Sequence, residues 1–123
     1  MIKPQSDFPL MEEYKKQFAI NDKTIFALGD DIYTNYPLTR DLLVHEEVHL
    51  RQQKELGVKE WVYDFLYNPE ARLKFEVEAY RKQLASIKDR NERYRVLLQS
   101  TRNLSSEMYG SIINYKDAYD LLK

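Results

Sequence analysis

The sequence predicts a mainly α-helical α+β fold with a single β-hairpin. The chain has 123 residues, 43% of them apolar, which suits one compact domain over residues 1–123. Only three glycines and four prolines occur, so a fibrous repeat or a disordered chain does not fit. Apolar residues mostly recur at helical spacing. Only the runs 24–28 and 32–36 are β-prone, and Gly29-Asp30-Asp31 lies between them as a tight turn.

Capping and stop residues divide the remaining chain into helices. Thr39 is placed to cap one long helix, and Gly57 is placed to end it. Asn68-Pro69 is a start signal, because Asn caps well and Pro is favoured at the first helical position. The segment 103–110 is expected to be irregular. The expected helices cover about residues 9–18, 40–56, 59–66, 69–87, 91–99 and 114 onward.

Composition limits the kinds of site and partner. The chain has no cysteine, so any metal must bind through His, Asp or Glu. It shows no apolar signal or membrane segment, which leads us to expect a cytoplasmic protein without a membrane partner. Residues 81–102 hold seven Lys/Arg and two Asp/Glu in a chain of net charge -1. We interpret this stretch as a solvated helical face, and binding of nucleic acid or an anionic polymer through residues 81–102 is the weaker alternative.

The predicted helix 40–56 contains the pattern HExxH, as His45-Glu46-Glu47-Val48-His49. At about 100° per residue, His45 and His49 lie ~40° apart on one face, so both imidazoles can reach one ion. Glu46 lies ~60° from His49 and can lean over that ion, whereas Glu47 points to the far side. These are the only two histidines of the chain. The pattern therefore supplies two metal ligands and one candidate base.

A catalytic zinc site needs a third protein ligand. One known extension, HExxHxxGxxH, would place it at position 55. Here Gln52 stands where that extension has its glycine, and a continuing helix carries Glu55 ~120° away from His49. Glu55 is therefore disfavoured.

The next long helix offers two other carboxylates, in the segment FEVEAY at residues 75–80. Glu76 and Glu78 lie ~200° apart on that helix, so only one of them can face the metal. Ala79 would allow close helix approach on nearly the same face as Glu76. We therefore expect Glu76 to be the third ligand, with Glu78 as the alternative.

These motifs resemble those of the gluzincin zinc metallopeptidases, in which HExxH is followed by a Glu on the next long helix. The segment FEVEAY is similar to their ExxAD element, with Glu76 and Ala79 matching. Residues 42–84 also resemble small uncharacterised HExxH proteins of bacteria and phages, with the pattern HExxHxxQ…ExEAY, which Gln52 fits. The resemblance implies a minimal zincin-like domain, in which a hairpin edge lies beside the HExxH helix and the Glu helix packs against it.

One position departs from the pattern of the larger families. They carry an Asp that orients a ligand histidine, and this chain has Tyr80 there. Another carboxylate is then expected to support the ligand histidines. The candidates are Asp30, Asp31 and Asp64.

The sequence thus favours an enzyme, a zinc-dependent hydrolase and more specifically a peptidase, with Zn²⁺ held by His45, His49 and Glu76. Water in the fourth position would have a pKa near 7, and Glu46 would take its proton and pass it to the leaving nitrogen. Tyr109 is the first candidate to donate to the tetrahedral oxyanion. The alternatives to Tyr109 are Tyr115, Arg102 and Tyr33.

The expected partner is a peptide or protein substrate, which could add as a strand along residues 32–36. A second hypothesis is a catalytically silent zincin-like domain with a regulatory or binding role. In that case zinc would act as a staple for a small core.

Overall fold

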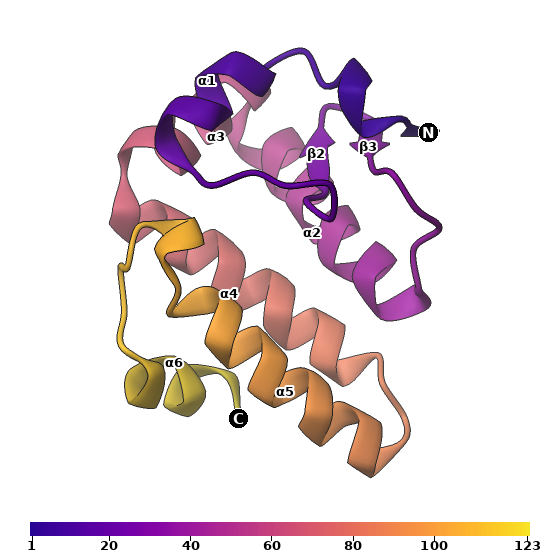
Figure 1. Ribbon diagram of the computed structural model, residues 1–123, viewed down its shortest axis with the longest axis vertical. Helices are drawn as coiled ribbons and strands as arrows, with labels where there is room; N and C mark the ends of the chain where they lie inside the picture. The colour runs from indigo at the N-terminus through magenta and orange to yellow at the C-terminus, as the bar shows by residue number, and fades with distance from the viewer.

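The computed structural model describes the backbone of residues 1–123 and every side chain except that of Met108. It confirms a mainly helical α+β fold, with six α-helices and a small mixed sheet of three strands (Figure 1). The helices are α1 (Met11–Gln17), α2 (Arg40–Leu56), α3 (Val58–Tyr67), α4 (Pro69–Ala85), α5 (Arg90–Leu104) and α6 (Tyr115–Leu122). The strands are β1 (Ile2–Lys3), β2 (Phe26–Leu28) and β3 (Asp31–Tyr33), and the single 3₁₀ turns are η1 (Gln5–Asp7) and η2 (Glu107–Tyr109).

The predicted hairpin forms, and a strand that was not predicted joins it. β2 and β3 pair antiparallel, and Gly29 begins the turn with φ +66°. β1 pairs parallel with β3, so the order is β1-β3-β2 and β3 is the central strand. Both edges of β3 are therefore occupied, and the prediction that a peptide adds along residues 32–36 is wrong.

Helix boundaries follow the capping signals closely. The Asn68 side chain accepts from the Ala71 N–H at the start of α4, and Asp89 caps α5 in the same way. Thr39 is the first residue before α2, as predicted, but its hydroxyl donates to Asp41 instead of capping the backbone. α5 continues to Leu104, past the predicted end near residue 99. Among the residues that the structure describes, no helix is long and apolar enough to cross a bilayer.

Two apolar clusters form the core, on either side of α4. The first is aromatic, and its buried members are Phe8, Tyr14, Phe26, Tyr33, Trp61, Phe65 and Leu66. The second fills the space between α4, α5 and α6, and its buried members are Tyr80, Leu84, Val96, Leu104, Ala118 and Leu122. Tyr109 packs against both clusters, so η2 joins the two halves of the core.

Helix α2 lies between the sheet and α4, and contacts both (Figure 1). The fully buried side chain of Gln53 ties it to β2. Its amide nitrogen donates to the Ala27 carbonyl at 2.9 Å, and its amide oxygen accepts from the Gly29 N–H at 2.7 Å. This two-bond clamp holds the hairpin in one position along α2.

Replacing Gln53 with Ala should lower the free energy of unfolding by about 1–3 kcal/mol, because the Ala27 carbonyl and the Gly29 N–H would lose buried partners. Urea unfolding measures the change. Gln17→Ala, at an exposed position of α1, is the matched control and should change stability by less than about 0.5 kcal/mol. Equal effects of the two substitutions would contradict the clamp.

Candidate metal centre

Helix α2 presents both histidines on one face, as its periodicity predicts. The Nε2 atoms of His45 and His49 lie 3.2 Å apart, and both side chains are buried. Glu46 is also buried, whereas Glu47 is exposed on the opposite face. The orientation of all three HExxH residues therefore follows from the helix alone.

Helix α4 brings Glu76 to the two rings, because Ala79, fully buried on the same helix face, lets α2 and α4 approach closely. Glu76 is only 2% exposed, and its Oε1 lies 2.5 Å from His49 Nε2 and 3.3 Å from His45 Nε2. These three residues form a buried group whose ligand atoms all lie within 4.8 Å of one another. Helix packing therefore completes the candidate site.

Glu78, the alternative ligand, points elsewhere. Its carboxylate pairs with Arg51 at 2.5 Å and accepts from the Gln52 amide at 2.8 Å, on a partly exposed surface. The choice between the two carboxylates thus resolves in favour of Glu76.

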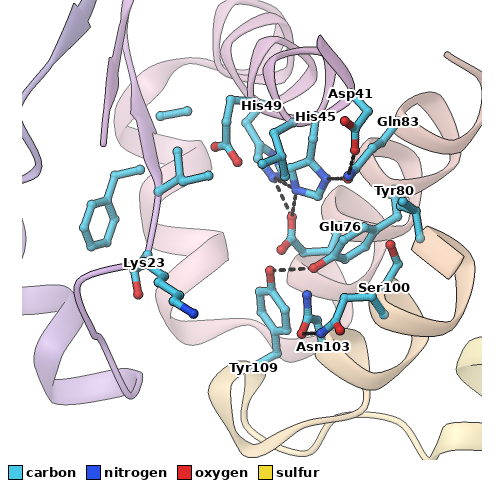
Figure 2. Close-up of a pocket in the computed structure, with 18 of the residues that line it drawn as sticks. Lys23, Asp41, His45, His49, Glu76, Tyr80, Gln83, Ser100, Asn103 and Tyr109 are labelled. Carbon is cyan, nitrogen blue, oxygen red and sulfur yellow. Dashed lines mark hydrogen bonds and ion pairs between the residues drawn. The ribbon is translucent and has the colours of Figure 1, made fainter. Parts of the chain in front are cut away.

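Hydrogen bonds on the far side of each ring fix which imidazole nitrogen carries the hydrogen. Gln83 donates its amide nitrogen to Asp41 at 2.8 Å, so its amide oxygen is left to accept from His45 Nδ1 at 2.9 Å (Figure 2). Because the Asp41 carboxylate can only accept, this orientation of the amide is forced. His45 therefore carries its hydrogen on Nδ1, and its Nε2 lone pair faces Glu76.

The ring hydrogen of His49 is also fixed by a glutamine amide, that of Gln52. The Trp61 indole N–H donates to the Gln52 amide oxygen at 3.1 Å, and that oxygen also lies 3.0 Å from His49 Nδ1. The Gln52 amide nitrogen donates to the Phe75 carbonyl at 3.1 Å. An indole nitrogen can only donate and a carbonyl can only accept, so the amide has one orientation. Neutral His49 therefore also directs an Nε2 lone pair toward Glu76.

When both rings are neutral, three acceptor atoms consequently face one point, and Glu76 Oε1 has no hydrogen-bond partner among the described residues. A buried, unsatisfied carboxylate oxygen is costly unless a cation lies beside it. For a tetrahedral ion with bonds of about 2.0–2.1 Å, neighbouring ligand atoms are roughly 3.3 Å apart. The His45–His49 and His45–Glu76 separations of 3.2 and 3.3 Å match this value, whereas the His49–Glu76 separation of 2.5 Å is that of a short hydrogen bond and would have to widen around an ion. The residues fit a divalent metal ion.

When no metal is bound, a proton on His49 supplies part of the positive charge that the ion would bring. Burial alone would lower the pKa of His49, but the charge of Glu76 outweighs it and raises the pKa to about 9. Burial would likewise raise the pKa of Glu76, yet the two histidines hold it well below its usual range. Proton and metal therefore compete for the same atoms.

The candidate base lies at the edge of a cleft. Burial raises the pKa of Glu46, against the opposing influence of His45 and His49. Glu46 lines a cleft of about 670 Å³ together with the three ligands. Glu46 is thus a buried residue that lines the same cleft as the three candidate ligands.

Tyr109 also lines the cleft, and its hydroxyl lies 3.1 Å from that of Tyr80 (Figure 2). Burial, followed by the charge of Glu76, raises its pKa well above the ordinary value. The alternatives named from sequence lie outside the cleft lining: Tyr115, Arg102 and Tyr33. Its assignment as the oxyanion donor stays a prediction.

A buried arginine holds Tyr109 in place. Arg72, 5% exposed, donates to the backbone carbonyls of Phe65 at 2.6 Å and Tyr109 at 3.2 Å. Gly110 follows with φ +85°, and a Cβ there would lie 3.2 Å from Arg72 Nη2. This contact explains why a residue far along the chain reaches the site.

The prediction that Asp30, Asp31 or Asp64 supports a ligand histidine is wrong. Asp30 pairs with Lys54 and Asp31 with Lys3, while both ring Nδ1 atoms bond to glutamines. The carboxylate next in line beyond His45 is Asp41, through Gln83. The sequence could have indicated this carboxylate, because Asp41 lies four residues before His45 and therefore on the same face of the helix.

The wall of the cleft opposite α5 is the segment 19–27, which crosses in front of α2 (Figure 1). Buried Gln5 fixes it by donating to the carbonyls of Asn21 at 2.9 Å and Thr24 at 2.7 Å. Tyr36 donates to the Lys23 carbonyl at 3.0 Å. Hydrogen bonds to other parts of the fold therefore hold this wall in position.

The purified protein should bind about one divalent metal ion per chain, since the described side chains form one such group of ligands. Glu76→Gln should weaken binding by at least about 100-fold, because an amide replaces the charged ligand. Glu78→Gln is the matched control and should retain the metal. Elemental analysis and chelator competition measure both, and equal losses would contradict the ligand assignment.

Metal binding near neutral pH should release about one proton per ion, because the metal displaces the proton held by His49 below its pKa of about 9. In the metal-free protein, the raised pKa stabilises the fold fully below the unfolded pKa of about 6.5, and this contribution is lost as the pH rises through about 9. Calorimetric titration in buffers of different ionisation enthalpy counts the proton. No proton release would contradict the competition.

No protein-family model, no curated protein and no solved structure matches this chain. The assignment therefore rests on the molecule itself. His45, His49 and Glu76 form a candidate metal-binding group at the floor of a cleft.

Proposed function

We propose that the protein is a zinc-dependent hydrolase that cleaves peptide bonds, with a site of the gluzincin type. The observation that carries the proposal is the buried group of His45, His49 and Glu76, whose Glu76 Oε1 has no hydrogen-bond partner among the described residues and which lines one cleft with Glu46. A metal held only for stability is usually enclosed by four protein ligands. Here three protein ligands are combined with a cleft, which leaves a position for solvent and substrate.

The ligand chemistry supports Zn²⁺. Two imidazoles and one carboxylate form the ligand set of many catalytic zinc sites. Bound zinc would supply a Lewis acid and a water of low pKa. His45, His49 and Glu76 would hold the ion, and their hydrogen bonds to other parts of the fold would keep them in place.

The chain's own residues would then manage the proton. Burial raises the pKa of Glu46, so its carboxylate is a better proton acceptor than an exposed one. Glu46 would hold the proton at a carboxylate oxygen and transfer it to the leaving amine nitrogen. Tyr109 would donate its hydroxyl hydrogen to the oxygen of the attacked carbonyl, because its high pKa keeps it protonated.

The wall of the cleft supports a peptide substrate. Ile25 lines the cleft just before β2, and its backbone N–H and C=O have no hydrogen-bond partner among the residues described. An extended peptide could pair with this backbone, as peptides do at exposed sheet edges. Ile25 thus takes the role that the sequence suggested for residues 32–36.

Glu46→Gln should retain zinc and lower the rate of peptide hydrolysis about 10²–10⁴-fold, because the amide cannot accept the proton. The measurement is cleavage of a peptide library, read by mass spectrometry, with zinc content determined in parallel. Glu47→Gln, on the exposed face of the same helix, is the matched control and should leave the rate unchanged.

Equal rates for the parent and Glu46→Gln would refute the proposed mechanism. A zinc-loaded parent protein that cleaves no peptide in the library would favour the second hypothesis, a catalytically silent zinc-binding domain.

A further inference from the structure

Each ligand histidine is joined to a carboxylate through the amide of a glutamine. On one side the order is His45, Gln83, Asp41, with contacts of 2.9 and 2.8 Å. On the other side His49 is followed by Gln52 and Glu78, with contacts of 3.0 and 2.8 Å. The amides come from different helices, Gln83 from α4 and Gln52 from α2.

A side-chain amide couples the directions of its two hydrogen bonds, because its nitrogen only donates and its oxygen only accepts. We propose that Gln83 and Gln52 are positioning residues that hold the metal-binding imidazoles in the Nδ1–H form, and that Asp41 sets the direction of Gln83. This inference rests on the metal group and not on peptide hydrolysis, so it can fail or succeed separately from the proposed function.

The two arrangements differ in how strongly the direction is fixed. Gln52 is held by three groups, namely the Trp61 indole, the Phe75 carbonyl and Glu78. Among the side chains that the structure describes, only Asp41 Oδ2 directs the amide of Gln83. The imidazole of His45 therefore depends on one carboxylate, whereas that of His49 does not.

Asp41 is itself held in its accepting role. The Thr39 hydroxyl donates to its Oδ1 at 2.7 Å, while Gln83 donates to Oδ2. Partial burial would raise the pKa of Asp41, but these hydrogen bonds lower it below its ordinary value. Asp41 is consequently a carboxylate at neutral pH, with both oxygens occupied by donors.

Asp41→Asn tests the direction directly. The backbone N–H groups of residues 41 and 42 also bond to this carboxylate and can only donate, so the asparagine oxygen should stay with them. The asparagine N–H would then turn toward Gln83, and the Gln83 amide would reverse. Gln83 would then present N–H to His45 Nδ1, which places the ring hydrogen on Nε2, at the metal position. Affinity for Zn²⁺ should fall about 10–100-fold, measured by competition with a chelator.

The double variant Asp41→Asn/Gln83→Glu should restore the site. The carboxylate at position 83 accepts both from the amide at position 41 and from His45 Nδ1, so the ring returns to the Nδ1–H form. Zn²⁺ affinity should recover to within about threefold of the parent protein. Gln83→Glu alone should bind Zn²⁺ more weakly than the double variant, because the carboxylates at positions 41 and 83 would face each other.

Glu78→Gln is the matched control, since the Trp61 and Phe75 contacts still fix Gln52, and the affinity should change by less than about threefold. Ring ¹⁵N shifts of His45 in the metal-free protein give a readout that a purely structural role would not move. They should show the hydrogen on Nδ1 in the parent and the double variant, and on Nε2 in Asp41→Asn.

Two results would overturn the inference. One is parental Zn²⁺ affinity with an unchanged His45 ring form in Asp41→Asn. The other is a folded double variant, verified by its thermal melting curve, that binds Zn²⁺ at least about 10-fold more weakly than the parent protein. The double variant keeps one donor and one acceptor at each contact, so it tests the inference even where Asp41→Asn fails to fold.

Discussion

The structure is organised around three acceptor atoms that face one another in the protein interior. Two imidazole nitrogens and one carboxylate oxygen cannot satisfy each other by hydrogen bonding when both rings carry their hydrogens on Nδ1. Such an arrangement has a high electrostatic cost unless a cation occupies the centre. The close approach of α2 and α4, which Ala79 allows, is what brings these atoms together. The packing of α2 against α4 therefore creates the electrostatic cost that a bound metal ion would relieve.

Each ligand is supported from a different part of the fold. His45 is held from α4 through Gln83, and His49 is held through Gln52, which also contacts α3 by way of Trp61. Glu76 has Tyr109 of η2 nearby, a residue that Arg72 fixes through its backbone. Four segments distant in sequence thus converge on one point. Ligand orientation follows from this convergence, because no single helix could restrain all three side chains.

The elements with strong local signals could be predicted from the sequence. The HExxH helix has the predicted bounds, and the Glu76 helix begins where Asn68-Pro69 indicates. The choice of Glu76 follows from helical geometry and the small residue Ala79. β1 could not be predicted, because two residues carry no periodicity and pair only through the tertiary fold. The role of Gln83 was missed for a similar reason, since an amide in a helix acquires meaning only from its neighbours.

The Gln53 clamp has a mechanical consequence. Gln53 follows His49 by one helical turn, so the helix that carries two metal ligands also carries the fastening of β2. The helix that carries the metal ligands and the adjoining strand are therefore fastened to each other. The opposite side of the cleft is lined by the exposed α5 side chains of Glu92, Arg95 and Gln99, which are free of this fastening. The cleft would therefore adapt to a bulky substrate on its α5 side only, while the α2–β2 side keeps its shape.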